Sequence, residues 1–510
     1  MTHDSNPDAT APDRAPVSSA PAESDPAPAA AEPVAGADVA DEAAPGRKSR
    51  YDRSLVEGPL LPAVWKIAWP TMLQNVIGGI QGIVDHTMVG HYVGFQGNAA
   101  IGVSWQIFLV VVVFISSLFT GMSVLVARFT GRDEEGKVNR TVYQAFLTAI
   151  FLALGILAPL GYVLAPGLLD LINAAPAVQV EALPYLRIMF VFSSGMLVFF
   201  MLGGALRSAG DAKTPLRLGI VVTVLNVILN VVLIAGLGPV PAFGTAGAAM
   251  GTVIASGAVA IYALYRLIAG GWVVSFPRGG SYLPDWTIIK QLFRFGLPTG
   301  LQGIAMNVAG VFLLRFVGSL PRSAAAQAAY AVGYTQLFSF ITWTSVGLMG
   351  AAATVAGQNL GAGNPERSSA AVRMASRIGL GGAAVIGVLF LLIPETLLGL
   401  FGLEEQAVVA LGTELLTFLA FSGLFVTVAL TYTGGLQGTG DTKSPLYISV
   451  VSQIVVPLGL CFVIQQTSTL DSWEIWLAIL LGHITRSTLS FLVFKRGAWR
   501  DIEVEIEPAT

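Results

Sequence analysis

The sequence GALRSAGDAKTPL at residues 204–216 returns as GGLQGTGDTKSPL at residues 434–446, at an offset of 230 residues between positions 204 and 434. A second pair, PTMLQ at 70–74 and PTGLQ at 298–302, has nearly the same offset. Repeated segments at one spacing indicate a duplicated structural unit. The chain is therefore expected to contain two copies of one fold, the second following the first.

The composition places both copies in a membrane. Hydrophobic residues make up 54% of the chain and charged residues 12%, about half of the ~25% that is typical of soluble domains. Apolar runs of 18 or more residues recur, and each is long enough to cross ~30 Å of hydrocarbon. The alternating pattern of a membrane β-barrel is absent, so the spans must be helices. A single cysteine, Cys461, excludes an intrachain disulfide and a metal cluster built from cysteines.

The apolar runs predict twelve transmembrane helices, six in each copy. An even number gives both copies the same orientation, so we expect two parallel-repeat six-helix lobes around a central cleft, related by an axis along the membrane normal. Pro and Gly residues mark the breaks between helices. The helices are expected near residues 63–90, 99–128, 140–165, 182–206, 215–236, 246–270, 288–318, 325–357, 369–394, 408–434, 446–466 and 474–496.

The chain is expected to divide into four parts. Residues 1–55 are rich in Ala, Pro, Asp, Glu and Ser, and this composition predicts a disordered tail. Residues 56–274 would form the N-lobe, residues 275–500 the C-lobe, and residues 501–510 a short tail. Lys and Arg gather in the loops after helices 2, 4, 6, 8 and 10. This bias predicts a multi-pass protein of the inner membrane with both termini in the cytoplasm.

Asp85 is an exception in the first apolar run. A charge at the centre of a bilayer helix costs about 2.5 to 3.5 kcal/mol on insertion scales. Steps of 4, 3 and 4 residues back from Asp85 reach Gln81, Gly78 and Gln74, and such steps keep to one face of a helix. This polar stripe is expected to face protein or water rather than lipid.

The fifth predicted helix carries a second stripe, formed by Thr223, Asn226 and Asn230. If the two stripes meet, carboxylate and amide oxygens could converge on a small cation such as Na⁺ at Asp85 and Asn226, because hard cations prefer oxygen ligands. Alternatively, Asp85 alone could bind and release a proton. The asparagines could also simply hydrogen-bond neighbouring helices.

These features resemble the multidrug and toxic compound extrusion (MATE) family over about residues 60–497. The resemblance implies two lobes around a V-shaped cleft, and export of amphipathic, often cationic organic compounds in exchange for H⁺ or Na⁺. We expect a transporter rather than an enzyme, because the sequence contains no nucleotide motif, metal cluster or nucleophile–base pair. It is expected to work as a monomer, with small organic substrates and the lipid bilayer as partners, and with no cofactor and no nucleic acid. The resemblance rests on the duplicated GxGDxKxPL loops, VDHTMVG in the first helix, VARFTG at 126 with VAGQNLGAGN at 355, and LNVILN in the fifth helix.

The resemblance carries over residue by residue in the first lobe. Asp85 matches the family's carboxylate in helix 1, and Asn226 matches the first residue of its Asn-x-x-x-Asp pattern in helix 5. Asn230 stands where many prokaryotic members have that Asp, and this loss of a negative charge favours H⁺ over Na⁺. Thr252 resembles a Thr that the family places at the same site.

The second lobe lacks this chemistry. Under the repeat offsets Asp85, Asn226 and Asn230 align with Leu313, Val456 and Leu460. One branch of the family has carboxylates in helices 7 and 10 of this lobe. This chain lacks them there, and in this respect it is more similar to the DinF-type branch. Coupling is therefore expected in the first lobe. The residues expected to line the substrate cavity are Gln74, Gln81, Gln302, Asn307, Gln336 and Trp343.

Two other functions fit parts of the sequence. A lipid-linked precursor flippase would need a basic central cavity for a pyrophosphate group, and Arg486 is the main candidate for it. A non-transporting scaffold or sensor would use residues 1–55 to bind a partner, and Asp85 would then be dispensable. The GxGDxKxPL loops are not phosphate loops, because they lack the GxxxxGK[ST] pattern and a preceding strand; they are expected to be structural hairpins.

Overall fold

The computed structural model describes residues 50–277, 279 and 282–506, and this part of the chain is helical without strands. Residues 1–49 of the predicted tail lie outside the described residues. The first half contains α1 (Leu60–Tyr92), α2 (Phe95–Gly131), α3 (Glu135–Ile150), the π-helical turn η2 (Phe151–Leu157), α4 (Ala158–Leu171), α5 (Pro176–Val191), α6 (Ser194–Ser208), α7 (Lys213–Ala235) and α8 (Gly244–Ala269).

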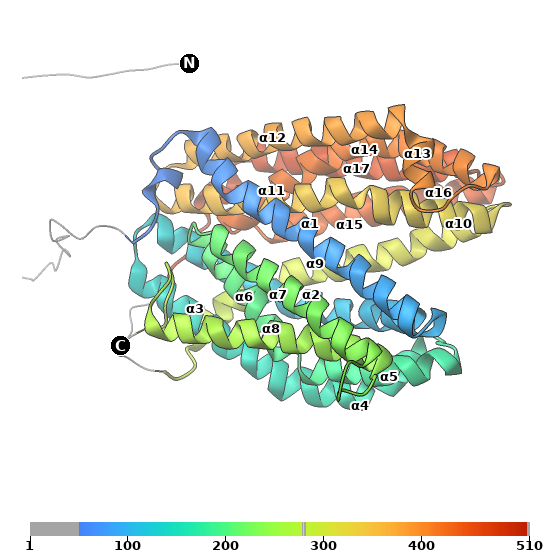
Figure 1. Cartoon of the computed structure of the whole chain (residues 1–510). Helices are drawn as coiled ribbons and strands as arrows, with labels where there is room; N and C mark the ends of the chain where they lie inside the picture. The colour runs from blue at the N-terminus through green and yellow to red at the C-terminus, as the bar shows by residue number, and fades with distance from the viewer. Residues whose placement is uncertain (1–49, 278, 280–281, 507–510) are drawn as a thin grey trace, which may run out of the picture. The chain divides into compact units, whose positions relative to one another are not determined.

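The second half repeats this order with more interruptions (Figure 1). It contains α9 (Trp286–Gly318), α10 (Ser323–Tyr330), η3 (Ala331–Leu337), α11 (Ser339–Gly361), α12 (Pro365–Leu392), α13 (Pro394–Gly399), α14 (Gln406–Thr439), α15 (Lys443–Val450), η4 (Val451–Val455), α16 (Val456–Thr467) and α17 (Ser472–Arg496). Short helical turns η1 (Arg53–Leu55) and η5 (Ala498–Asp501) flank the two halves.

Ten helical segments of the described chain are long and apolar enough to cross a membrane, when α3 to α4, α10 to α11 and α15 to α16 are each counted as one continuous segment. The pair α5–α6, bent by 53°, makes an eleventh span. Helix α1 has 33 residues but is too polar to be counted with them. The polar stripe that contains Asp85 lies in this helix. The predicted number of twelve is therefore reached only when α1 is included.

The repeated loops have the same geometry in both halves. Gly210 and Gly440 both adopt a left-handed backbone, with φ of 98° and 105°. The carboxylates of Asp211 and Asp441 each accept a hydrogen bond at 3.0 Å from the backbone nitrogen three residues later. Each loop is therefore a tight hairpin in which glycine allows the turn and aspartate satisfies the first turn of the next helix.

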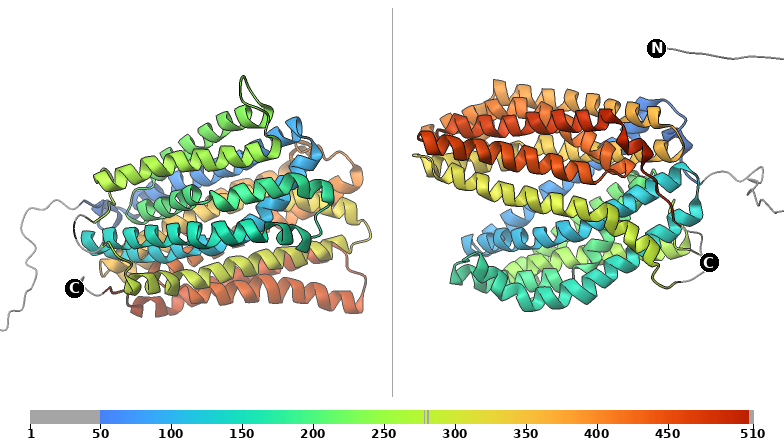
Figure 2. Two further views of the ribbon diagram at one scale, coloured as in Figure 1. Left: turned by 90° about the horizontal axis from the view of Figure 1, so that it is seen from below. Right: turned by 180° about the vertical axis from the view of Figure 1, so that it is seen from behind.

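We call the end of the helices that carries Arg128, Lys213, Arg373 and Lys495 the basic end. The two halves meet through α1 and α2 of the first half and α9 and α11 of the second. Figures 1 and 2 show the helices of the two halves converging toward the basic end and diverging away from it.

At the basic end α2 and α11 touch backbone to backbone. A Cβ atom on Gly131 would lie 2.0 Å from the carbonyl oxygen of Gln358, and a Cβ atom on Gly361 would lie 2.2 Å from that of Arg128. At an offset of 230 residues, Arg128 corresponds to Gln358 and Gly131 to Gly361. The contact is thus reciprocal, as expected for two copies related by a two-fold axis.

The segment before α1 joins the same contact, and here the structure differs from the predicted disorder of residues 50–55. Tyr51 and Leu55 are buried, Leu55 completely. The side chain of Asn359 on α11 donates to the carbonyl oxygen of Leu55 at 3.1 Å, and Leu55 also packs under Gly210 in the hairpin of the first half. Burial of the two apolar side chains orders these residues despite the polar composition before them.

The segment after α17 crosses in the opposite direction. Trp499 is buried in a core formed mainly by the second half, whereas Val504 and Ile506 are buried in the core of the first half. Arg128 and Arg132 of the first half donate to the carbonyl oxygens of Ile502 and Val504 at 3.0 and 3.2 Å. The described part of the predicted C-terminal tail is therefore packed rather than extended into solvent.

Helix α1 belongs to both halves. Its first two turns, including Val64 and Ile67, lie in one core with Leu348 and Val355 of α11. Beyond Pro70, which removes one helical hydrogen bond, α1 runs along α7 of the first half. The lobe boundaries at residues 56 and 274 stay a prediction, because α1 does not pack in one half alone.

The reciprocal glycine contact makes a testable prediction about stability. We expect Gly131→Ala and Gly361→Ala each to lower the thermal unfolding temperature of the purified protein. Overpacking a close backbone contact costs about 1–3 kcal/mol, and the opposing atoms are carbonyl oxygens that cannot rotate away. Gly382→Ala in α12 is the matched control, because a Cβ atom there meets nothing within 4 Å. If both glycine variants unfold at the wild-type temperature, the close contact between α2 and α11 does not contribute to stability as predicted.

Candidate functional site

A cavity of about 450 Å³ lies among the helices of the first half. Helices α1, α2, α5, α6, α7 and α8 contribute to its wall, and α11 adds Trp343 and Val346. Its size falls within the range of small-molecule sites. Its polar lining consists of Gln74, Asn75, Gln81, Asp85, His86, Thr223, Thr252 and Ser256, together with the ring-bearing Trp105, Tyr185 and Trp343.

The polar stripe of α1 forms one side of this cavity. Gln74, Gly78, Gln81 and Asp85 all line it, so the stripe faces the interior of the bundle. At the stripe's end nearest the basic end, Arg207 of α6 donates to the side-chain oxygen of Gln74 at 3.2 Å. Sequence reasoning missed Arg207, because a basic residue close to a hairpin looked like part of the cytoplasmic loop.

The stripe of α7 faces the stripe of α1. Thr223 donates to the side-chain oxygen of Gln81 at 2.9 Å. Asn230 donates through its amide nitrogen to Asp85 Oδ1 at 2.6 Å. Among the described residues no cation forms an ion pair with Asp85, so hydrogen bonds from α7 are its observed stabilisation.

Asn226 connects Asp85 to α8. It is completely buried, and its amide satisfies its neighbours when its oxygen accepts from the Thr252 hydroxyl at 3.1 Å and its nitrogen donates to Asp85 Oδ1 at 3.0 Å. Two amide N–H groups then converge on one carboxylate oxygen, an arrangement that stabilises a negative charge. The structure thus brings together Asp85, Asn226, Asn230 and Thr252.

A glycine makes room for this cluster. A Cβ atom on Gly251 of α8 would lie 2.1 Å from Asn230 Oδ1, so any other residue would displace the amide that holds Asp85. Asn230 Oδ1 is buried and has no hydrogen-bond partner among the described residues. Sequence reasoning missed Gly251, although its place directly before Thr252 in AAMGTVIAS was a usable signal.

The remaining cavity wall is apolar and aromatic. Met196 and Phe199 of α6, Trp105 of α2 and Tyr185 of α5 line it. Trp343 of α11 reaches it across the boundary between the halves, since its ring occupies the space that a Cβ atom on Gly79 would need. Such a wall suits amphipathic organic compounds, because flexible Met and aromatic side chains accept varied shapes.

Three of the polar residues expected on the second lobe's wall lie outside this cavity's lining. Gln302 is buried, donates to the Ser449 hydroxyl at 2.8 Å and accepts from Gln437 at 3.2 Å. Asn307 donates to the backbone of its own helix at 2.9 Å. Gln336 lies in the π-helical turn η3. Of the four residues expected from the second lobe, Trp343 is the one that reaches the cavity.

Comparison with known proteins agrees with the duplicated architecture. A family model described as MatE matches the chain twice, over residues 70–232 and 298–463, which together exceed half of its length. The two matches begin 228 residues apart, as PTMLQ and PTGLQ do.

Curated relatives match over most of their length. A probable multidrug resistance protein NorM from Thermotoga maritima is 27% identical over 445 residues, covering 85% of this chain and 92% of the relative. A probable multidrug resistance protein YpnP from Bacillus subtilis is 27% identical over 461 residues, covering 90% of this chain and 99% of the relative.

Solved structures share the fold. An outward-facing multidrug resistance MATE family transporter of the MOP superfamily has a TM-score of 0.81 at 20% identity, covering 88% of this chain and 98% of that one. A MOP superfamily transporter from Pyrococcus furiosus, described as having a binding pocket of reverse polarity, has a TM-score of 0.81 at 21% identity over the same shares. The fold is thus that of a MATE transporter, and the resemblance in sequence is confirmed: the protein belongs to the MatE family.

Proposed function

We propose that this MATE family transporter is a secondary active antiporter that exports amphipathic, often cationic organic compounds in exchange for protons. Asp85 is the coupling residue, and Asn226, Asn230 and Thr252 position it. The relatives' names as multidrug resistance proteins support the substrate class. The observation that carries the proposal is that Asp85 lines a drug-sized cavity while hydrogen bonds from α7 hold its carboxylate.

The direction of the amides favours a proton over a sodium ion. Asn230 aims its amide nitrogen at Asp85, and Asn226 does so in the amide orientation that satisfies all of its neighbours, whereas Na⁺ would need their oxygens. The Asn230 oxygen instead lies against Gly251. Sodium binding would thus require both buried amides to reverse, but a proton needs only Asp85 itself and one amide that can turn.

Protonation gives Thr252 a specific role. Beside a charged Asp85, the Thr252 hydroxyl donates to the Asn226 oxygen. Beside a protonated Asp85, the Asn226 amide can reverse, so that its oxygen accepts the carboxyl proton and its nitrogen donates to Thr252 at the same 3.1 Å. The hydroxyl then donates to the carbonyl oxygen of Ala248, 3.1 Å away. A hydroxyl serves both states because it is donor and acceptor.

The substrate and the proton would use the cavity in turn. A charged Asp85 attracts a cationic compound, whose apolar part packs on the ring-bearing wall of Trp105, Tyr185 and Trp343 and whose charge can lie against an aromatic face. A proton arriving from outside neutralises Asp85, which removes this attraction and releases the compound. The cycle therefore exchanges one proton for each compound at a single carboxylate.

The orientation and branch belong to the same proposal. The basic end faces the cytoplasm, as the excess of Lys and Arg there suggests, so both termini lie inside. The protein works as a monomer. The DinF-type branch is favoured because α9, the seventh predicted helix, has no carboxylate, and α14, the tenth, has one, Glu414, near its start.

The rival functions have less support. A flippase would need a basic cavity, but Arg486 is buried in the second half and no Lys or Arg is among the residues that line this cavity. Arg207 touches the cavity through Gln74 and is the nearest candidate. A scaffold or sensor function does not require the hydrogen-bonded cluster around Asp85.

We expect Asp85→Asn to abolish export that is driven by a pH gradient, because an amide cannot cycle between a charged and a protonated state. The assay is uptake of a fluorescent organic cation by proteoliposomes under an imposed gradient. Glu414→Gln is the matched control: its new amide oxygen can still accept from Ser472 and Trp476, the partners of Glu414 at 2.7 and 3.2 Å, so export should continue. Wild-type export by the Asp85 variant would exclude the mechanism.

The choice of ion has its own test. A pH gradient alone should drive export by the wild-type protein, and a sodium gradient at equal pH should not. The result that argues against the proposal is export driven by sodium alone with no response to pH.

We expect Thr252→Val to reduce export roughly tenfold, because Asn226 loses the hydroxyl that holds its amide beside Asp85, and one neutral hydrogen bond contributes about 1–1.5 kcal/mol. Thr252→Ser keeps the hydroxyl and should retain most of the activity. Both variants are compared in the same proteoliposome assay after their melting temperatures are measured. Equal activity of the Ser and Val variants would show that the hydroxyl has no part in coupling.

We expect removal of residues 1–49 to leave export unchanged, since the contacts that close the basic end begin, within the described part of the chain, with Arg50, which pairs with Glu135 at 2.8 Å. A scaffold or sensor would lose its function with this segment. Loss of export in the shortened protein at an unchanged melting temperature would favour the scaffold.

A further inference from the structure

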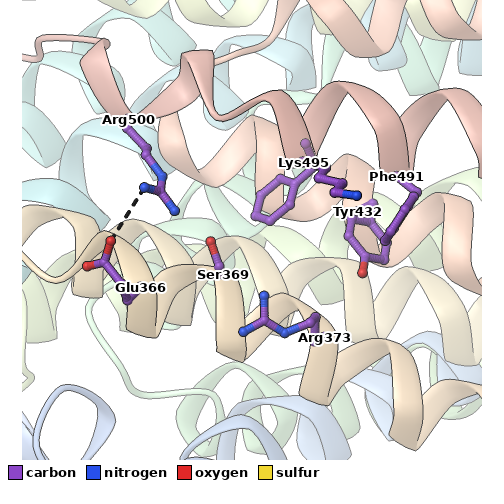
Figure 3. Close-up of a pocket in the computed structure, with 8 residues that line it drawn as sticks. Glu366, Ser369, Arg373, Tyr432, Phe491, Lys495 and Arg500 are labelled. Atoms are coloured by element: carbon purple, nitrogen blue, oxygen red, sulfur yellow. Dashed lines mark ion pairs between the residues drawn. The ribbon is translucent and has the colours of Figure 1, made fainter.

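A second cavity, of about 350 Å³, lies at the basic end of the second half. It is bounded by the first turns of α12, the last turns of α14, and the end of α17 with the segment after it. Figure 3 shows side chains of α12 facing side chains of α17 across this space. The cavity is remote in sequence and in lining from the site around Asp85, with which it shares no residue.

The lining of this cavity includes three basic side chains, Arg373, Lys495 and Arg500, and one carboxylate, Glu366. Arg500 pairs with Glu366 at 3.4 Å, which leaves Arg373 and Lys495. In the part of the chain that the structure describes, no carboxylate pairs with either of these two residues. The described lining therefore has more positive than negative charge, which favours an anionic ligand.

Two hydroxyl groups add hydrogen-bonding capacity at the same place. Ser369 and Tyr432 line the cavity, and both residues are buried. Neither side chain has a hydrogen-bond partner recorded among the described residues, and Ser369 lies one turn before Arg373 on α12. A tetrahedral oxyanion can accept from hydroxyls and cations together, so the chemistry fits a phosphate group better than a carboxylate.

The apolar side of the cavity distinguishes a lipid from a soluble anion. The Tyr432 ring packs edge-on against Phe491 and Phe494 at centroid distances of 5.5 and 5.4 Å. Phe491 is 41% exposed and Leu492 beside it 46%, so apolar surface continues from the cavity along the outside of α17. A cationic rim beside an outward apolar surface at a helix end matches the boundary between headgroups and acyl chains.

We propose that this cavity binds the phosphate of an anionic phospholipid, with Arg373 and Lys495 as the phosphate ligands and Ser369 and Tyr432 as hydroxyl donors. The acyl chains lie along Phe491 and Leu492. Under the proposed orientation the lipid belongs to the cytoplasmic leaflet. Basic pockets between transmembrane helices on that side are known to recognise such headgroups.

The bound lipid would also reinforce the closed basic end. Arg500 lines the cavity, and its neighbour Trp499 stacks on Phe494 at 4.9 Å. The same segment continues to Ile502, whose carbonyl oxygen accepts from Arg128 of the first half. A lipid that orders the start of this segment therefore stabilises a contact between the two halves.

The test uses the full-length protein in detergent with three probes: phosphatidylglycerol, phosphatidylcholine and inorganic phosphate. Native mass spectrometry measures bound lipid, and thermal unfolding measures stabilisation. Wild-type protein is expected to retain phosphatidylglycerol and to gain stability from it, with little effect of the other two probes. Arg373→Gln/Lys495→Gln is expected to bind phosphatidylglycerol roughly 30-fold more weakly, which corresponds to about 1 kcal/mol for each basic residue.

The matched control is Arg294→Gln/Lys443→Gln, which removes the same charge from exposed positions of the second half outside the cavity; it should bind as wild type does. Arg373→Lys keeps the charge and should retain most of the affinity, which separates ligation from misfolding. Equal loss in both double variants would mean that net charge alone attracts lipid, and equal stabilisation by inorganic phosphate would mean a soluble-anion site. Either result overturns the proposal, as does unchanged binding by the cavity variant. None of them affects the Asp85 tests, because the cavity lies in the other half.

Discussion

In this protein α2 and α11 touch backbone to backbone, and glycine is what allows them to do so. Gly131 faces the Gln358 carbonyl and Gly361 faces the Arg128 carbonyl, so each copy of the repeat supplies one glycine and one oxygen. Segments from both ends of the described chain cross the same contact, through Leu55 on one side and the residues around Ile502 on the other. The halves are thereby fixed at the basic end and can separate only further along their helices.

That constraint decides where a buried charge is tolerated. A carboxylate in a lipid-facing helix would cost several kcal/mol, and α1 is already less apolar than its neighbours. Asp85 avoids the cost by facing a polar cavity, where the amides of Asn230 and Asn226 replace part of its hydration. Gly251 provides the space for this arrangement. The site is therefore a property of three packed helices, α1, α7 and α8, and no single helix contains it.

The sequence predicted those parts of the structure that depend on spacing within one helix. Helical periodicity put Gln81 and Asp85 on one face of α1, and the repeat put equivalent hairpins in both halves. It could not predict which side chains of different helices meet. Gln302 has the same residue type as Gln81, yet it is buried against Ser449, and Trp343 reaches the cavity only because Gly79 leaves room. The burial of Tyr51 and Leu55 also depends on distant neighbours, so local composition pointed to disorder instead.

The two halves share their closing contact but not their chemistry. Where the first half has Asp85 and Asn230, the second has Leu313 and Leu460, which pack into its hydrophobic core. A change at Asp85 must therefore reach the second half through α1. This helix is suited to that role, since Asn75 donates to the Trp343 backbone of α11 at 3.2 Å and Gly347 of α11 packs against Met72. Helix α11 ends at Gly361. One helix thus carries the carboxylate and rests on the helix that closes the basic end, so movement of α1 at the cavity would bear directly on that closure.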